Sequence, residues 1–243
     1  MTKPRRNPDL SATTERAALT EALADKGIHH GNLIGEIHKV GCFLKATSAV
    51  AGPGEGVALV HTDRRNDHEV ELAVVIGKSG KFFGPDEAES DYIAGYTVFN
   101  DITARDIQRR EMRSGVFSFC KAIDTFCPLG PWIVTPDEIP DPHDLAMELR
   151  VNGEVRQTSH SSRMSVTIPE ILSHYSALGY SAGDVVSTGT VSGVAGFSQD
   201  AGSLYLKPGD VMEAEIERIG ILRNPVISWR EAHGAPAPPR VRW

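Results

Sequence analysis

The sequence predicts a mixed, mainly β protein of the α+β class, in which a few short helices interrupt the sheet. Two observations predict this class. Segments rich in β-branched and aromatic residues recur along most of the chain, separated by glycine, proline or aspartate. Helical patterns are confined to three short segments. With 243 residues, the chain is long enough to bury a core without a disulfide or a structural metal.

The first predicted helix spans residues 13–26, where alanine and leucine recur at helical spacing and Gly27 stands at the position of a C-terminal cap. Asn152-Gly153, which lies between two of the later apolar runs, tolerates positive φ and suits a tight hairpin turn. After the helix the β-branched and aromatic runs predict strands at residues 42–47, 56–60, 68–77, 92–100, 131–135, 146–151, 154–159, 184–190 and 210–216.

Two further helices are expected among the strands. One runs from Ile102 to about Arg113, and the other from about Pro169 to Leu178, where proline suits the first helical position. The last eleven residues, 233–243, include three prolines and few apolar side chains that could be buried. This composition predicts a tail or an arm that clasps a partner. The chain shows no internal repeat and no break in composition, which favours a single domain.

Composition argues against several classes of protein. The chain has 25 Lys+Arg against 32 Asp+Glu, a net charge of -7, which opposes the phosphate-neutralising surface of a nucleic-acid binder. No run of eighteen apolar residues occurs, so we expect no membrane span. The three cysteines lack Cys-x-x-Cys spacing, and no apolar signal-peptide core follows the basic N-terminus. We therefore expect a cytoplasmic protein.

The run HEVELAVVIG, residues 68–77, carries two acidic residues. Strand alternation puts Glu69 and Glu71 on one face and an entirely apolar set on the other. Because the acidic face ends in apolar residues, we expect the carboxylates to be half buried. Two carboxylates one pleat apart repel each other, and a hard divalent cation such as Mg²⁺, Mn²⁺ or Ca²⁺ removes that cost.

The same spacing occurs elsewhere in the chain without any need for a metal. In DVMEAEIERIG, Glu213, Glu215 and Glu217 alternate with apolar residues, which predicts a strand with a solvated acidic face. Carboxylates usually stay in water. Glu-x-Glu by itself is therefore more typical of a solvated face than of a metal site.

A third acid, Asp101, follows the run YIAGYTVFN and precedes a predicted helix, at a strand-to-helix corner where functional groups often gather. The helical spacing puts Asp101, Arg105 and Gln108 on one face. An acid, a cation and an amide on one face suit a metal together with a carboxylate or keto-acid substrate, because a guanidinium pairs with a planar anion in a fork. The alternative is a purely structural aspartate N-cap with an arginine four residues on.

Several motifs in order resemble the C-terminal catalytic domain of the fumarylacetoacetate hydrolase superfamily: HEVELAVVIG, YIAGYTVFNDITARDIQ, FCKAIDTFCPLGPWIVTPDEIPDP, VNGEVRQ, GDVVSTGTVSGV and LKPGDVMEAEIERIGILRNPV. The resemblance extends from about Phe43 to Val226. It implies a rolled mixed β-sheet with a few short helices, usually assembled as a homodimer. It also implies three regions: a helix and lid-like segment at 1–42, a catalytic domain at 43–228 and a proline-rich tail at 229–243.

Known members of this superfamily hydrolyse, decarboxylate or isomerise acylpyruvates and related 2-oxo dioates. A 2-oxo acid can chelate the metal, which polarises the carbonyl and stabilises the departing enolate, and the active-site lysine would add charge or deliver a proton. The resemblance implies two sets of site residues in this chain: the metal ligands Glu69, Glu71 and Asp101, for Mg²⁺ with Mn²⁺ or Ca²⁺ as substitutes, and the substrate-binding residues Arg105, Gln108, the catalytic Lys121, and Thr190, which holds the substrate carboxylate.

Two segments depart from the family pattern. Members commonly carry Tyr-x-x-His-x-x-Glu on a lid, whose His and Glu activate water, whereas this chain has GIHHGNLIGEIHKVGCFLK. The candidate substitute pair is His30 with Glu36, although the local pattern does not select among His29, His30 and His38. The second departure is Lys121-Ala122-Ile123-Asp124, where the family often has Lys-Ser-Phe-Asp; the lysine is kept, and the change affects packing more than chemistry. The segment between Gly193 and Asp210 resembles subfamilies with a longer glycine-containing connection, which we expect to border the active site and shape specificity.

The sequence thus leads to three hypotheses. The first is a divalent-metal-dependent hydrolase that cleaves a C–C bond in an acylpyruvate-like 2-oxo acid, of the acylpyruvate or fumarylpyruvate type. The second is an isomerase or decarboxylase of a 2-oxo-hepta-ene-dioate in aromatic degradation. The third is a catalytically inactive binding subunit, which the altered lid motivates.

Overall fold

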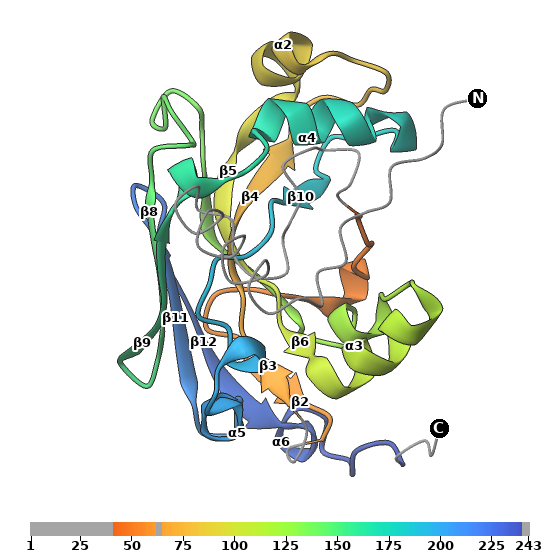
Figure 1. Ribbon diagram of the computed structural model, residues 1–243, viewed down its shortest axis with the longest axis vertical. Coiled ribbons are helices and arrows are strands. Elements are labelled where there is room, and N and C mark those ends of the chain that lie inside the picture. Colours follow the sequence, from red (N-terminus) through yellow and green to blue (C-terminus); the bar gives the residue numbers. More distant parts are fainter. Residues whose placement is uncertain (1–40, 62–64, 240–243) are drawn as a thin grey trace, which may run out of the picture.

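The computed structural model describes residues 41–61 and 65–239 (Figure 1). The predicted helix at 13–26 and the candidate pair His30 and Glu36 lie outside these residues, as do His29 and His38. Within the described residues the protein is built mainly from strands in mixed sheets, joined by short helices and turns. The predicted fold class is therefore confirmed.

The strands form two five-stranded sheets and one two-stranded ribbon. Each five-stranded sheet contains one parallel pair, β1 with β7 or β2 with β12, and is otherwise antiparallel. The first sheet has the order β1 (Val50–Ala51), β7 (Cys127–Val134), β5 (Ile93–Asn100), β4 (Val70–Ile76) and β10 (Val185–Ser187). The second has the order β2 (Val57–Leu59), β12 (Gly220–Ser228), β11 (Val211–Ile216), β8 (Ala146–Val151) and β9 (Glu154–His160). The ribbon pairs β3 (Asn66–Asp67) with β6 (Thr103–Ala104).

Short helices surround the sheets: α2 and α4 lie at one end of the molecule, α5 and α6 at the other, and α3 beside β6 (Figure 1). The α-helices are α2 (Pro85–Glu87), α3 (Arg105–Glu111), α4 (Ile168–Tyr175), α5 (Ala201–Leu204) and α6 (Trp229–His233). One π-helical turn spans Ala88–Tyr92. Single 3₁₀ turns lie at Thr47–Ala49, Met112–Ser114, Phe119–Lys121, Ser161–Arg163, Ser176–Leu178 and Ala195–Phe197. No helix among residues 41–61 and 65–239 is long and apolar enough to cross a membrane.

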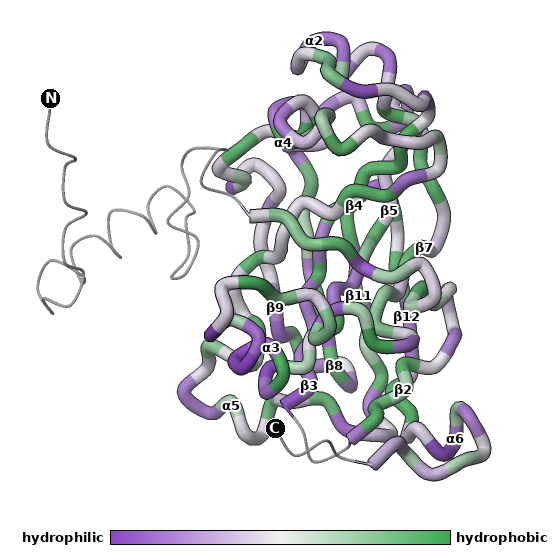
Figure 2. The backbone as a smooth tube through the Cα atoms, turned by 90° about the vertical axis from the view of Figure 1, so that its right-hand side faces the viewer, coloured by the Kyte–Doolittle hydropathy of each residue, from purple (hydrophilic) through white to green (hydrophobic). Residues whose placement is uncertain are grey.

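The two large sheets share one hydrophobic core, in which side chains of β4 and β5 meet side chains of β8, β11 and β12. Apolar segments of the backbone accordingly gather in the central strands (Figure 2). Strand β4 is buried along its whole length. Val70, Leu72, Val74 and Ile76 enter the main core, which confirms the predicted apolar face, while Ala73 on the opposite face packs in a smaller cluster.

Several predicted elements agree closely with the structure. Strand β8 and the hairpin to β9 are as predicted, and both turn residues, Asn152 and Gly153, have positive φ, at 54° and 80°. The helix predicted near Pro169 begins one residue earlier, at Ile168, where Thr167 and Glu170 form a capping box. The alternation along β11 is also confirmed, because its glutamates stay partly exposed while the apolar residues between them are buried.

Other boundaries differ because tertiary contacts override local pattern. The helix predicted from Ile102 begins at Arg105, since residues 103–104 pair with β3 instead. The strand predicted at 184–190 ends at Ser187, and beyond it Thr188 contacts the Leu72 carbonyl through both its backbone N–H and its hydroxyl group. The segment 229–233 of the predicted tail forms α6.

One predicted strand is absent, and one long strand was missed. Residues 42–47 do not form a strand: the chain turns there, the Ala49 N–H donates to the Ala46 carbonyl, and Lys45 points inward to an acidic partner. Conversely, β12 was not predicted. Its Pro225 has no N–H to donate and is rare inside strands, yet Pro225 pairs in register with Val211 and the flanking residues complete the sheet.

Candidate metal and substrate site

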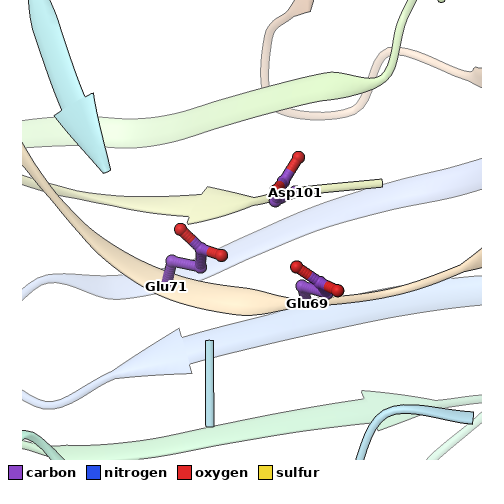
Figure 3. Close-up of side chains that lie close together, drawn as sticks. All are labelled: Glu69, Glu71 and Asp101. Carbon is purple, nitrogen blue, oxygen red and sulfur yellow. The ribbon is translucent and has the colours of Figure 1, made fainter. Parts of the chain in front are cut away.

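Three carboxylates meet where β4 begins and β5 ends. Glu69 directly precedes β4, Glu71 lies within it, and Asp101 directly follows β5. The antiparallel register pairs Val70 with Asn100, and the Asp101 N–H donates to the Glu69 carbonyl at 2.8 Å. One carboxylate oxygen from each residue lies within 4.8 Å of the others. Figure 3 shows the three side chains on these neighbouring segments.

The carboxylates are more deeply buried than the sequence predicted. Glu69, Glu71 and Asp101 are only 6%, 4% and 2% exposed, whereas we expected half-buried side chains at an outer strand end. The difference arises because the chain around Phe43–Lys45 and the turn that carries Lys121 pack over this end of the strand. Burial of three acids is costly unless each meets a partner.

Two lysines contact the cluster. Lys121 Nζ lies 2.8 Å from Glu69 Oε2 and also donates to Asp101. Lys45 forms a second ion pair with Asp101. Sequence reasoning singled out Lys121 but not Lys45. A lysine within the apolar run CFLKAT was the available signal, since lysine is seldom found among buried residues without a partner.

The Arg105 guanidinium is fixed from three directions. Its Nη2 lies 2.6 Å from Glu69 Oε1, its Nη1 donates to Gln108 Oε1 at 3.0 Å, and its Nε donates to Asp67 Oδ2 at 2.7 Å. The expected closeness of Arg105 and Gln108 is therefore present. Asp101 does not share their helix, and Ala104 rather than Asp101 is the N-cap residue, so neither the single helix face nor the N-cap alternative is correct.

Glu71 differs from the other two acids, because its hydrogen-bond partners in the described part of the chain are neutral. Its Oε2 accepts the Ser187 hydroxyl and the Gly189 N–H, the latter at 3.1 Å. Burial, together with the negative charges of Asp101 and Glu69, raises the pKa of Glu71 to about 8. Among the described side chains, no cationic group is in direct contact with the Glu71 carboxyl group.

The remaining ionisable groups of the cluster are paired. Burial alone would raise the pKa of Glu69, but Lys121 and Arg105 outweigh it and hold that pKa below its usual value. Burial raises the pKa of Asp101, and Lys121 and Lys45 offset only part of this effect. For Lys121, burial is outweighed by Glu69 and Asp101, so the lysine pKa lies above its usual value and the side chain stays an ammonium ion.

The last turn of α3 positions Lys121. The Glu111 carboxylate accepts the N–H groups of Phe119 and Cys120 at 3.0 and 2.9 Å, and thereby caps the 3₁₀ turn that carries the lysine. Burial alone would raise the pKa of Glu111, but these backbone hydrogen bonds lower it. Helix α3 therefore supplies Arg105 at its start and orients Lys121 from its end, a role for Glu111 that sequence reasoning missed.

Thr190 lies beside β4, where its hydroxyl donates to the Val70 carbonyl at 3.0 Å. The same hydroxyl accepts Gln157 Nε2 at 3.0 Å, and Gln157 Oε1 accepts the Val70 N–H. Thr190 therefore lies next to the strand of the candidate ligands. To donate to a substrate carboxylate, its hydroxyl must rotate away from the Val70 carbonyl.

The surface acids of β11 behave differently from the buried cluster. Glu213 and Glu215 contact Arg150 at 3.6 and 2.8 Å, and Glu213 also approaches Arg223. Each is partly exposed. Arginine side chains therefore lie against the charges of this surface Glu-x-Glu pair, whereas Glu71 has only neutral hydrogen-bond partners among the described residues.

The donor set of the buried cluster fits a hard divalent cation. Carboxylate oxygens are the preferred ligands of Mg²⁺, Mn²⁺ and Ca²⁺, and the three acids can direct oxygens to one point. Glu71 in addition has its ionised form disfavoured at neutral pH by burial and by its acidic neighbours, a penalty that a cation removes. The residues present therefore suit such an ion.

Residues 22–227 match the sequence profile of the fumarylacetoacetate (FAA) hydrolase C-terminal family. The chain is 46% identical to a maleylpyruvate hydrolase from Aquipseudomonas alcaligenes over 208 residues, which cover 84% of this chain and 66% of that protein. It therefore spans just under two thirds of the length of that relative.

Solved structures agree with this similarity. A maleylpyruvate hydrolase from Sphingobium sp. SYK-6, in complex with manganese (II) ion and pyruvate, superposes with a TM-score of 0.67 at 33% identity and covers 79% of this chain and 67% of its own. A 2-hydroxyhepta-2,4-diene-1,7-dioate isomerase from Mycobacterium marinum superposes with a TM-score of 0.67 at 37% identity and covers 76% and 68%. The profile, the identity and the shared fold together show that this chain belongs to the fumarylacetoacetate hydrolase family.

Proposed function

We propose that this chain is a divalent-metal-dependent enzyme that hydrolyses an acylpyruvate-like 2-oxo acid. Water adds to the acyl carbonyl, the C–C bond to the pyruvyl group breaks, and the products are a carboxylic acid and pyruvate. The observation that carries this proposal is the buried Glu71, which lacks a contacting cation among the described side chains, next to two further carboxylates, Arg105 and Lys121.

Glu69, Glu71 and Asp101 would hold the metal, with Mg²⁺ as the expected ion and Mn²⁺ or Ca²⁺ as substitutes. The complex of the related Sphingobium hydrolase with manganese (II) ion and pyruvate supports a divalent ion and a 2-oxo acid at this site. When bound, the cation supplies Lewis-acid polarisation of a substrate carbonyl. The remaining chemistry falls to side chains of this protein.

Arg105, Gln108 and Thr190 are proposed to bind the substrate. Thr190 is assigned to the carboxylate of the 2-oxo group, which leaves Arg105 and Gln108 for the part of the substrate beyond it. Arg105 has five N–H groups, and its three contacts hold the guanidinium in a fixed plane. A donor that is oriented in advance loses little entropy when it binds a carbonyl or a carboxylate.

Lys121 is proposed as the catalytic lysine. Because Glu69 and Asp101 hold its pKa above the usual value, the side chain remains positively charged in the absence of metal and can stabilise negative charge that develops on a substrate oxygen. We propose His30 with Glu36 as the pair that activates water; both lie outside the described residues.

The second candidate is isomerisation or decarboxylation of a 2-oxo-hepta-ene-dioate, which the likeness to the Mycobacterium marinum isomerase favours. Both reactions use the same polarised 2-oxo group. They differ from hydrolysis because they need no attacking water, so the water-activating pair is dispensable for them.

Product analysis tests these proposals. The purified chain is incubated with acylpyruvates, fumarylpyruvate and oxaloacetate, with Mg²⁺ or with EDTA, and the products are identified by mass spectrometry. We expect pyruvate and the matching acid only with Mg²⁺. Isomer or CO₂ without the acid would support the second candidate, and binding without any turnover would indicate an inactive binding subunit. Activity that survives thorough chelation would contradict the metal mechanism. We also propose that the chain forms a homodimer, as the family resemblance implies, and light scattering of the same sample tests this.

A further inference from the structure

The 3₁₀ turn Ala195–Phe197 holds a large aromatic side chain in solvent at the rim of the candidate site. Phe197 is 76% exposed, although the two residues that begin the turn, Val194 and Ala195, are 3% and 0% exposed. The exposed phenyl ring therefore projects from a firmly packed base. Exposure of so much apolar surface is unfavourable in the free protein, and a ligand that covers it would recover that cost.

The base of the turn is fixed by a buried carboxylate. Asp67, which is 0% exposed, accepts the Ala195 N–H and the Gly196 N–H, each at 2.8 Å. The same carboxylate accepts Arg105 Nε at 2.7 Å and the His68 N–H at 2.9 Å. Hydrogen bonds to an ionised acceptor are among the strong ones. One side chain thus fixes both the turn and the guanidinium.

The turn and the guanidinium are in very close contact. A Cβ atom on Gly196 would lie 2.9 Å from Arg105 Nε and 3.1 Å from Asp67 Oδ2, so a side chain at this position would push the turn away. The Phe197 ring lies over the same guanidinium, with its centroid 5.8 Å from Arg105 Cζ. Arg105 in turn contacts the candidate ligand Glu69.

The exposed Phe197 ring thus lies next to Arg105. Arg105 is the residue that the proposed function assigns to the part of the substrate beyond the 2-oxo group. The Arg105 side chain is 10% exposed, and the centroid of the exposed Phe197 ring lies 5.8 Å from its Cζ atom. The first residues after Thr190 lead directly into this turn, so one segment connects the proposed carboxylate-binding residue to the aromatic rim. Figure 1 shows α5, which follows the turn, close to β3, which carries Asp67.

We infer that Phe197 is a specificity-determining residue that contacts the acyl arm of the substrate, and that Asp67 is the positioning residue that holds it there. The inference rests on the proposed function, since it assumes that a 2-oxo acid binds at the carboxylate cluster. We therefore expect the preferred substrate to have an acyl arm long enough to lie against the Phe197 ring, rather than a pyruvyl group alone.

Calorimetric titration of the Mg²⁺-loaded chain with pyruvate and with 2-oxohexanoate tests this inference. Neither compound has the second carbonyl that C–C hydrolysis requires, so binding is measured without that cleavage. The longer acid has three additional methylenes. If the Phe197 ring covers one side of these methylenes, 2-oxohexanoate should bind about tenfold more tightly than pyruvate.

In Phe197→Ala this preference should fall at least fivefold, whereas the affinity for pyruvate changes less than threefold. Phe82→Ala is the matched control, because Phe82 is 73% exposed and also lies over a cationic side chain, that of Lys81. An unchanged preference in Phe197→Ala, or equal weakening of both ligands, would overturn the inference.

Asp67→Asn tests the positioning role of Asp67. The asparagine replaces one acceptor oxygen by an NH₂ group, which cannot accept hydrogen bonds from the N–H donors that Asp67 holds. We expect loss of the chain-length preference, with Asp91→Asn, a surface-paired aspartate, as control. A preserved chain-length preference in folded Asp67→Asn would exclude the positioning role of Asp67.

The two proposals can fail separately. If acylpyruvates are not cleaved but the binding preference depends on Phe197, only the proposed function fails. If neither acid binds, both fail.

Discussion

The ammonium group of Lys121 lies 2.8 Å from Glu69 Oε2 and also contacts Asp101, so one buried lysine joins two of the three candidate metal ligands. The lysine is 3% exposed. A charge buried this deeply is tolerated only because oppositely charged groups, Glu69 and Asp101, contact it directly. The contact therefore links the charge balance of the metal-free site to the group proposed to act on the substrate.

Lys121→Met should lower kcat by about 100-fold, the usual effect of removing one preorganised donor from a charge-stabilising site. Affinity for Mg²⁺ should not weaken, because a positive charge next to the ligands is removed. Steady-state kinetics and metal titration measure the two effects. Lys78→Met, which removes an exposed lysine paired with Asp91, serves as control. An unaltered kcat would reject the catalytic role of Lys121.

Glu71→Gln should weaken Mg²⁺ binding at least tenfold while the chain remains folded, since the amide keeps an oxygen for the Ser187 and Gly189 donors but loses the charge. Titration calorimetry measures the affinity. Glu215→Gln changes the equivalent acid of the surface Glu-x-Glu pair and should have no effect. If Glu71→Gln binds Mg²⁺ as tightly as the parent chain, Glu71 is not a ligand.

The raised pKa of Glu71, at about 8, predicts how the stability of the metal-free chain depends on pH. The folded state holds this proton more tightly than the unfolded state, so its contribution to stability is complete below about pH 4.5 and is lost as pH rises toward 8. Glu71→Gln removes this dependence. In EDTA, the Tm of the variant relative to that of the parent should rise by at least about 2 °C between pH 5.5 and pH 8.

Saturating Mg²⁺ at pH 8 should raise the Tm of the parent more than that of the variant, because the cation stabilises only a folded state that binds it. Differential scanning calorimetry of both proteins under the three conditions provides the six Tm values. A constant Tm difference between pH 5.5 and pH 8 in EDTA would show that folding does not raise the pKa of Glu71.

Glu111→Gln should lower kcat by about tenfold with little change in Mg²⁺ affinity, because the turn that orients Lys121 loses its charged cap. A loss of stability of about 1–3 kcal/mol is also expected. The control is Glu170→Gln, which weakens the capping box of α4 far along the chain from the cluster. A variant with reduced Tm but normal kcat would show that Glu111 supports the fold alone.

Much of the fold follows from local pattern. The alternation along β4 and β11 and the Asn152-Gly153 turn predicted faces and a hairpin that the structure contains. Strand β12 escaped prediction because Pro225 is unfavourable in a strand by itself, and only its neighbours β11 and β2 make that strand stable. The helix after Asp101 was predicted to begin three residues too early for a similar reason, since Thr103 and Ala104 find partners in β3.

The candidate site divides in the same way. Strand periodicity and the motifs of the family singled out Glu69, Glu71, Asp101, Arg105 and Lys121, because these residues are close in sequence to strong local patterns. The partners of these side chains come from distant segments: Lys45 reaches Asp101 across 56 residues, and Ser187 reaches Glu71 across 116. No local pattern contains such contacts.

The sequence by itself determined which residue types are available and which of them share a strand face, because periodicity and turn chemistry act over a few neighbouring positions. Only the tertiary structure decided that Glu71 would be buried without a contacting cation among the described side chains, that Glu111 would cap the Lys121 turn, and that Asp67 would join Phe197 to Arg105. Burial and charge pairing depend on which distant segments pack together, and this packing is set by the contacts of the whole hydrophobic core rather than by neighbouring residues in the sequence.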